Sequence, residues 1–469
     1  MKTNITTHVK KTLADTLTPV NVYLKIRDKF SEPLLLESTD FHGDENSYSI
    51  LCCETIASIS VENNTLTKQY PTKPTQKTAL SKDMSVPEEI NSFIQSFSVS
   101  QDISNKHING FFGYNAYDAV TYFEDISLTQ RTKEENAIPE IKYNFYKYII
   151  VFNHFNSELY IIENLVEHEE SCLQNIIDII QNKSFGLFDF QSTSEEYSNL
   201  TNNEFISNIQ KIKEHCYRGD VIQTVLSRQF SQKFIGDEFN VYRSLRSINP
   251  SPYLFFFDFG TFKIFGSSPE SQIIIRNNKA TINPIAGTFK RTGNDKDDEK
   301  LAKELISDPK ENSEHIMLVD LARNDLSISG TNVCVEKFRE IQYFSHVLHM
   351  VSKVTADIPA ETNPIQLMAD TFPAGTLSGA PKYKAMQLID TYENQGRGFY
   401  GGSIGYIDFH GNINQAITIR SFLSKDNTLY YQAGAGIVAK SVEENELEEI
   451  NNKLLALKNA IKNAEHINL

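Results

Sequence analysis

Short runs in which apolar and polar residues alternate dominate the first 190 residues. The runs Val22–Ile26, Tyr146–Phe152 and Leu159–Ile162 are rich in β-branched and aromatic residues and have the period-two alternation typical of strands. Residues 62–108 are instead rich in Thr, Lys, Ser, Asn and Gln, which predicts surface loop with one short helix. The first part of the chain is therefore predicted to be mostly sheet.

The pattern changes after a polar break at residues 191–200. Residues 205–217 have helical spacing, and strand-like runs follow at residues 221–230, 253–257, 272–275, 402–408 and 429–432. This mixture predicts an α+β protein built on large, mostly antiparallel sheets in a sandwich, with helices packed outside. The break predicts two regions, residues 1–190 and residues 200–465.

Residues 311–325 carry the densest group of candidate chemical side chains. Glu311, Glu314 and His315 stand at i, i+3 and i+4 and so share one face of a helix. The apolar run at residues 316–319 carries that helix into a core, which leaves the carboxylates at a half-buried mouth. Carboxylates in such a place need a cation, and without a neighbouring Cys the hard ion Mg²⁺ fits better than zinc.

A structural role is the alternative for Glu311. Asp308, Pro309 and Glu311 have the spacing of an N-cap, a first-turn proline and a capping-box glutamate. Glu311 would then only stabilise the start of the helix.

Composition and charge narrow the class of protein. A chain of 469 residues that is 40% hydrophobic can bury a large core. Sixty acidic against forty-five basic residues give a net charge of -15, which argues against nucleic acid as a partner. The five cysteines form no CxxC motif, as expected of reduced thiols in a cytoplasmic protein. No apolar run approaches the ~18 residues of a membrane span, and the N-terminus lacks an apolar signal segment.

Further motifs lie on both sides of residues 311–325. In chain order they are Ser268-Pro269-Glu270, Pro284–Thr288, His349–Ser352, Pro373–Pro381, Gly405-Tyr406, Ala416–Arg420 and Gly434–Gly436. Together they resemble the chorismate-utilising enzymes over about residues 205–460. The resemblance implies a sheet sandwich in which the N-terminal region entwines with a chorismate-binding half.

Chorismate carries two carboxylates, and a dianion is bound by arginine forks and backbone N–H donors. Arg420 suits one carboxylate, and glycine lets the backbone approach a ligand closely. An ordinary ion pair and simple turns are the alternatives. At the positions that match the family's motifs, the resemblance implies eight substrate contacts. They are Gly287, Thr288, Tyr406, Arg420, Gly434, Ala435, Gly436 and Lys453.

The last helix offers a second set of carboxylates. Glu446, Glu449 and Lys453 stand at i, i+3 and i+7, on a different face from its apolar stripe. The resemblance implies Mg²⁺ bound directly by Glu314 and Glu449, with Glu311 and Glu446 acting through water. The alternative is a solvated charged face.

The resemblance to the family also implies residues for acid–base catalysis. Glu270 resembles the general acid that protonates the departing C4 hydroxyl of chorismate, a role that needs a pKa raised by burial. His349 resembles a catalytic residue for ring-proton transfer or pyruvate elimination, with a buried core histidine as the alternative. Thr376 is expected to position the substrate.

Two positions distinguish the branches of the family. Water-adding members place a lysine base at the position of Gln223, and the para-aminobenzoate branch places a nucleophilic lysine at the position of Ala286. Gln223 is expected to position ammonia, which needs no base. The pair resembles the anthranilate synthase branch, which converts chorismate and ammonia to anthranilate and pyruvate. The alternatives are component I of aminodeoxychorismate synthase and a catalytically dead, tryptophan-sensing binding protein.

Regulation and partners follow from two more features. Leu34–Ser38 and Asn249–Leu254 resemble the two parts of the family's tryptophan feedback motif. The expected effector contacts for L-tryptophan are Ser38, Pro252, Tyr253 and Leu254, with Leu36 beside them. No cysteine stands on the glycine-flanked elbow of a glutaminase. Ammonia is therefore expected from a separate glutamine amidotransferase subunit in a hetero-oligomer.

Overall fold

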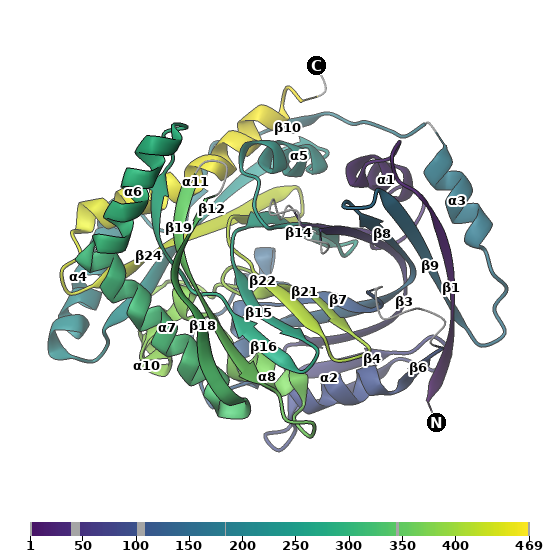
Figure 1. Cartoon of the computed structure of the whole chain (residues 1–469), viewed down its shortest axis with the longest axis horizontal. Helices are drawn as coiled ribbons and strands as arrows, with labels where there is room; N and C mark the ends of the chain where they lie inside the picture. The colour runs from purple at the N-terminus through teal and green to yellow at the C-terminus, as the bar shows by residue number, and fades with distance from the viewer. Residues whose placement is uncertain (1, 39–46, 101–107, 183, 344–346, 468–469) are drawn as a thin grey trace.

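In the computed structural model, residues 2–38, 47–100, 108–182, 184–343 and 347–467 are described (Figure 1). Two long strands, β3 (Tyr48–Glu62) and β8 (Ile141–Asn153), pair with each other and join two series of strands. One series of antiparallel neighbours leads from β3 through β2 (Leu34–Glu37), β13 (Tyr253–Asp258), β14 (Phe262–Ser268), β23 (Ser421–Lys425) and β24 (Thr428–Val438) to β12 (Gln223–Gly236). A second leads from β8 through β7 (Gly110–Asn115), β21 (Ser403–Asp408), β22 (Ile413–Ile417), β15 (Ser271–Arg276) and β16 (Lys279–Ile282) to β19 (Val347–Asp357).

The remaining strands extend these two series. Those in the first part of the chain are β1 (Thr3–Leu13), β4 (Thr65–Gln69), β5 (Gln76–Ala79), β6 (Phe97–Val99) and β9 (Glu158–Val166). Those that pair with β12 are β10 (Phe190–Ser192), β11 (Tyr197–Ser198) and β20 (Gly379–Ala380). Those that pair with β19 are β17 (Ile285–Lys290) and β18 (Thr331–Tyr343).

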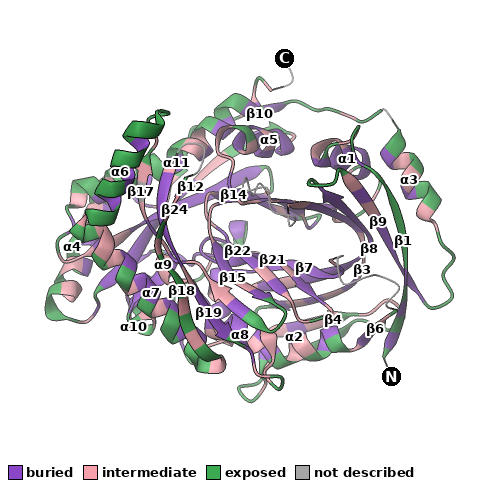
Figure 2. Cartoon of the chain, viewed as in Figure 1, coloured by how far each residue is buried: buried purple, intermediate pink, exposed green. Residues whose placement is uncertain are grey.

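The helices lie around the sheets, with their exposed faces outward (Figures 1 and 2). They are α1 (Pro19–Ile26), α2 (Val86–Gln95), α3 (Leu173–Gln181), α4 (Asn202–Arg218), α5 (Phe239–Ile248), α6 (Asp295–Ser307), α7 (Pro309–Ser329), α8 (Pro364–Asp370), α9 (Gly375–Ser378), α10 (Lys382–Tyr392) and α11 (Glu443–Ala464), with 3₁₀ turns at Tyr117–Tyr122 and Glu134–Asn136. None of the described helices is long and apolar enough to cross a membrane. The predicted α+β sandwich with outer helices is confirmed.

The two halves of the sequence share their sheets. Strand β2 pairs with β13, and β7 pairs with β21, so each series passes without a break from strands before residue 190 to strands after residue 200. One buried apolar cluster likewise joins Leu35 and Ile150 to Leu254 and Leu457. The division into residues 1–190 and 200–465 therefore follows the order of the chain and does not separate two cores.

Three segments differ from the predicted elements. Residues 22–26 lie in helix α1 because Thr18 accepts a hydrogen bond from Asn21 N at 3.2 Å and Pro19 occupies the first turn. Residues 62–108 contain β4, β5 and β6 besides the expected helix α2. The polar break contains β10 and β11, which cover the edge of β12.

Candidate active site

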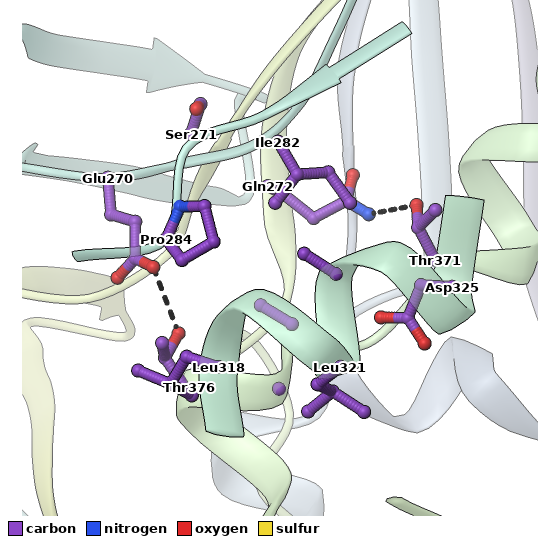
Figure 3. A pocket seen from close by; sticks show the side chains of 13 residues that line it. Glu270, Ser271, Gln272, Ile282, Pro284, Leu318, Leu321, Asp325, Thr371 and Thr376 are labelled. Carbon is purple, nitrogen blue, oxygen red and sulfur yellow. Dashed lines mark hydrogen bonds between the residues drawn. The ribbon is translucent and has the colours of Figure 1, made fainter. Parts of the chain in front are cut away.

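Glu270 follows β14 and is held by neighbours from two other segments. Its carbonyl accepts a hydrogen bond from Ile417 N at 3.0 Å, and its carboxyl Oε1 accepts one from Thr376 Oγ1 at 3.2 Å (Figure 3). Desolvation raises the pKa of Glu270 to about 8, although the Thr376 hydrogen bond and the charges of Arg420 and Lys453 oppose this. The carboxyl is therefore protonated at neutral pH and can act as an acid.

Arg420 stands between β22 and β23 in a left-handed backbone conformation with a φ of 49°. Its guanidinium makes neither an ion pair nor a hydrogen bond to the described part of the chain. Desolvation lowers its pKa, and the nearby Glu270 opposes that shift. A half-buried arginine without a protein carboxylate is suited to an anionic ligand.

His349 lies on β19 with 5% of its surface exposed. Its Nδ1 donates a hydrogen bond to the Gly287 carbonyl at 3.3 Å, since a carbonyl can only accept. Desolvation lowers the pKa of His349 to about 4; the Gly287 contact opposes this and the charge of Arg420 adds to it. The imidazole is therefore neutral, with its basic lone pair on Nε2.

Gly287 brings β17 next to helix α7. Its φ is 71°, and a Cβ there would lie 2.6 Å from Leu305 Cδ1 and 3.0 Å from Glu311 Oε2. Glycine is therefore required at this position. The close approach also places the carboxylate of Glu311 beside the residues that surround His349.

The Glu311 carboxylate does not cap its helix. The Asp308 side chain is the N-cap and accepts from the amides of Lys310 at 2.8 Å and Glu311 at 3.0 Å. No described hydrogen bond returns from the Glu311 carboxylate to the cap. Desolvation and then the charge of Glu314 raise the pKa of Glu311, as expected of carboxylates that share a confined place.

Glu314 faces helix α11. Desolvation and then the charge of Glu449 raise its pKa, while Lys310, Lys453 and a hydrogen bond from Gln223 oppose the shift. Glu449 is exposed and pairs with Lys453 at 2.7 Å. Glu446 is buried, and desolvation raises its pKa. The four predicted carboxylates thus come from two helices into one region.

Gln223 begins β12 beside the glycine-rich part of β24. A Cβ at Gly436 would lie 2.3 Å from Gln223 Nε2, and Lys453 Nζ donates to the Gly434 carbonyl at 2.8 Å. The Gln223 side chain is buried, and its Oε1 has no hydrogen-bond partner. Gln223 therefore offers an unused acceptor in the same site as Glu314 and Lys453.

Two predicted substrate contacts, Tyr406 and Ala435, do not bring their side chains to this group. The ring of Tyr406 lies 5.8 Å from that of Phe112 and packs in the apolar cluster that includes Leu36 and Tyr253. The Ala435 methyl is buried in a different cluster, since it alternates with Gly434 and Gly436 along β24. Thr288 lies in β17, and its side chain is outside the described residues.

The two predicted parts of the effector site are adjacent. Strands β2 and β13 pair with Glu37 opposite Leu254. Tyr253 and Leu36 pack in one apolar cluster. Leu254 points to the opposite face of the sheet, into the cluster of Leu35, because side chains alternate along a strand. Ser38 is half-buried at the end of β2, and Pro252 is half-buried just before β13.

The acidic residues of α7 and α11 are the candidate magnesium ligands. No group of three or more His, Cys, Asp or Glu side chains in the described ranges is arranged to hold a metal by itself. Mg²⁺ commonly takes one or two carboxylates and completes its shell with water and substrate. Glu314 and Glu449 fit this requirement, because the charge of Glu449 disfavours ionisation of Glu314 and a cation would remove that repulsion.

Arg397 is a supporting residue that the sequence patterns did not indicate. It is buried, bonds both carboxylate oxygens of Glu393, and donates to the carbonyls of Leu377 at 2.6 Å and Val225 at 2.7 Å. It therefore ties the turn that bears Thr376 to the strand that begins at Gln223. The only local feature of the sequence that marks Arg397 is its position between two glycines.

Comparisons with known proteins agree with this geometry. The chain matches the chorismate binding enzyme family over residues 44–459. It is 36% identical to anthranilate synthase component 1 of Aquifex aeolicus (strain VF5), over 97% of this chain and 94% of that protein. The component 1 of Lactococcus lactis subsp. lactis (strain IL1403) is 34% identical, over 96% of this chain and 98% of that protein. The crystal structure of anthranilate synthase component I from Streptococcus pneumoniae TIGR4 superposes with a TM-score of 0.78 at 30% identity, over 96% and 99% of the two chains. The chain belongs to the chorismate binding enzyme family.

Proposed function

We propose that this protein is component I of an anthranilate synthase, a lyase that converts chorismate and ammonia to anthranilate and pyruvate. The observation that carries the proposal is the buried, unpaired Oε1 of Gln223. An N–H of ammonia can donate to this oxygen, and ammonia is nucleophilic without a base. Water would need a base to attack, which an amide cannot provide.

The first chemical step uses Glu270 and Gln223. The nitrogen of ammonia bonds to the ring while the C4–O bond breaks, and the proton of Glu270 passes to the departing hydroxyl to form water. Arg420 binds a substrate carboxylate, and the backbone near Gly434 and Gly436 approaches the ligand closely. The product of this step is aminodeoxyisochorismate.

The second step eliminates pyruvate and leaves the aromatic ring. The proton on the ring carbon that bears the amino group passes to the neutral imidazole of His349 while the ring C–O bond to the enolpyruvyl group breaks. The released enolpyruvate takes up a proton at its methylene carbon and becomes pyruvate. The support for His349 in this role is its lowered pKa and the tautomer that its contact with Gly287 sets.

Mg²⁺, when bound, neutralises and orients a substrate carboxylate. Glu314 and Glu449 would hold it directly, and Glu311 and Glu446 would act through water. The support is the raised pKa of Glu311, Glu314 and Glu446, each of which faces another carboxylate of the group.

Two alternative functions are less well supported. Component I of aminodeoxychorismate synthase would need an amine where this chain has Ala286, a residue without a nucleophile. A catalytically dead tryptophan sensor would not need the acid Glu270, the neutral His349 and the unpaired Arg420 around one site.

The protein has a partner subunit and an inhibitor. A separate glutamine amidotransferase subunit supplies ammonia in a cytoplasmic hetero-oligomer, because no cysteine of the chain stands in a glutaminase motif. L-tryptophan inhibits by binding near Ser38, Pro252 and Tyr253, with Tyr406 added to the pocket because it packs with Leu36 and Tyr253.

Product analysis tests the proposed reaction. The purified chain is expected to form fluorescent anthranilate from chorismate, Mg²⁺ and ammonium salts at alkaline pH, and not from glutamine. Aminodeoxychorismate or isochorismate as the main product would reject the assignment. Efficient use of glutamine by the chain alone would reject the two-subunit arrangement.

A further inference from the structure

A cavity extends from Glu270 and Thr376 to Gln272, Thr371 and Asp325 (Figure 3). The centre of a water molecule fits within about 30 Å³ of it, which is room for roughly two or three waters at 10–15 Å³ each. Arg420 and His349 do not line this space, so it adjoins the acid from outside the group that would contact chorismate. Its remaining walls are Ser271, Ile282, Pro284, Leu318, Leu321, Ala322, Ala374 and Gly375.

Gln272 gives the cavity a polar wall. Its Nε2 donates to Thr371 Oγ1 at 2.8 Å, and the Thr371 hydroxyl donates in turn to the Met368 carbonyl at 3.0 Å. Because the hydroxyl proton is used in this way, Thr371 can only accept from Gln272, which fixes the amide orientation. Oε1 of Gln272 is then a buried acceptor without a partner. An apolar cavity stays dry, but one with an unpaired acceptor and a carboxyl at each end favours water.

Asp325 and Lys382 connect the far end of the cavity to solvent. Lys382 Nζ lies 2.8 Å from Asp325 Oδ2 and also donates to the Thr371 carbonyl at 3.2 Å. The two side chains remain 11% and 12% exposed, so a proton can pass between the pair and bulk water. Asp325 ends the 311–325 motif, and the proposed reaction assigns it no task.

We infer that this cavity binds a short chain of water molecules that returns a proton to Glu270 after each turnover. The inference rests on the proposed function. When Glu270 gives its proton to the departing C4 hydroxyl, water leaves and the acid remains as a carboxylate. The ammonium group formed by the attack of ammonia loses one proton to solvent, and the water chain delivers one proton to Glu270, so the cycle has no net change in protons.

A substitution that fills the cavity tests the inference. In Ala322→Leu the added carbons occupy the space, whereas Asn324→Leu adds the same side chain on the exposed face of the same helix and is the control. Anthranilate fluorescence is followed at pH 7 in two regimes: a single turnover with enzyme in excess, and multiple turnovers with chorismate in excess. Thermal unfolding is measured for each variant.

The water chain predicts that the two regimes respond differently. Glu270 starts protonated, so the single-turnover rate should stay within about twofold of the parent, while the multiple-turnover rate falls about tenfold or more. The solvent deuterium isotope effect on the multiple-turnover rate should rise. Equal loss in both regimes would mean that the substitution disturbed Glu270 itself, and no loss in either would mean that the cavity has no part in proton return; both results overturn the inference.

A second pair of variants keeps the test decisive if Ala322→Leu fails to fold. Gln272→Met removes the unpaired acceptor at similar volume, and Asp325→Asn removes the carboxylate at the far end. Both are expected to show the same split between the two regimes. The proposed function is tested separately, on the parent chain alone. A parent chain that forms no anthranilate would reject that function, whereas the water chain is tested by comparing the variants with the parent.

Discussion

Thr376 and Glu270 meet through one hydrogen bond, Oγ1 to Oε1 at 3.2 Å, although 106 residues separate them in the chain. The bond uses the oxygen that carries no proton, so the acidic proton of Glu270 lies on Oε2. A donor to a carboxylate favours its ionised form, and this contact therefore limits how far burial raises the pKa of Glu270.

Removing that donor should move the pH profile in a defined direction. In Thr376→Val the pKa of Glu270 should rise above about 8, and the alkaline fall in kcat should shift to higher pH. Thr376→Ser keeps the hydroxyl and should retain the parent profile. The measurement is kcat between pH 6 and 10, and an unchanged alkaline limb in Thr376→Val would contradict the assignment of Glu270 as the acid.

Glu270→Gln should separate catalysis from stability. Loss of a general acid lowers kcat by about 10²–10⁴-fold. The pKa of Glu270 is about 8 in the folded chain, against about 4.3 in an unfolded one, so the folded state holds the proton more tightly. The stabilisation from this proton is complete below about pH 4 and is lost as the pH rises through about 8.

The glutamine of the Glu270→Gln variant is neutral at every pH, so the variant does not share the parent's loss of stability. The Tm of the variant relative to that of the parent should therefore be higher at pH 9 than at pH 6. Scanning calorimetry at both pH values checks this difference. If the difference in Tm between the parent and the variant is the same at the two pH values, the carboxyl of Glu270 is not held in its protonated form.

The acidic pair between α7 and α11 should control the magnesium requirement. Glu314→Gln and Glu449→Gln are each expected to remove most activity and to raise the Mg²⁺ concentration needed for half-maximal rate. Glu448→Gln changes an exposed carboxylate of the same helix and serves as the control. If the carboxylates only formed solvated surface charges, each change would cost at most ~1 kcal/mol of stability and leave turnover near normal.

Gln223 should set the affinity for ammonia. Gln223→Met removes the unpaired acceptor and should raise the KM for ammonium by about 5–150-fold, as expected for one lost hydrogen bond of about 1–3 kcal/mol. The KM for chorismate should change much less. Gln232→Met on the half-exposed end of the same strand is the matched control. Parallel increases in both KM values would indicate general damage to the site.

Tryptophan binding can be measured directly because the chain contains no Trp. The fluorescence of added L-tryptophan should change on binding, and Ser38→Phe should abolish inhibition while sparing catalysis, since the ring fills the pocket. Ser31→Phe, at an exposed position nearby, should keep both properties. Full sensitivity in Ser38→Phe would place the effector elsewhere.

Arg397 should be required for stability. Arg397→Met leaves the buried Glu393 carboxylate without its partner, which costs about 3–5 kcal/mol. Adding Glu393→Gln removes the stranded charge and should recover part of that loss. Denaturant unfolding of the three proteins measures their free energies of unfolding, which should fall in the order parent, double variant, Arg397→Met. A double variant that is less stable than Arg397→Met would contradict this order.

The sequence by itself determined many of the elements and the chemical groups of this protein, although residues 22–26 form helix α1 and not the predicted strand. Strand-like runs predicted β8, β9, β13 and β21, because β-branched and aromatic residues favour strands. Spaced motifs indicated Glu270, Glu314, His349, Arg420 and Gly434 through family resemblance. The helical spacing of Glu311 and Glu314 places both carboxylates on one face of their helix.

Only the tertiary structure decided which of these groups share a site. Tyr406 and Leu254 belong to the right motifs, but the pleat of their strands turns both side chains away from their expected partners. Asp308 and Glu311 both suited a cap, and the folded helix uses Asp308 alone. The Arg397 network and the cavity between Glu270 and Asp325 depend on contacts between segments far apart in the chain. Such contacts leave no periodic mark in the sequence, because they are set by how the sheets and helices pack.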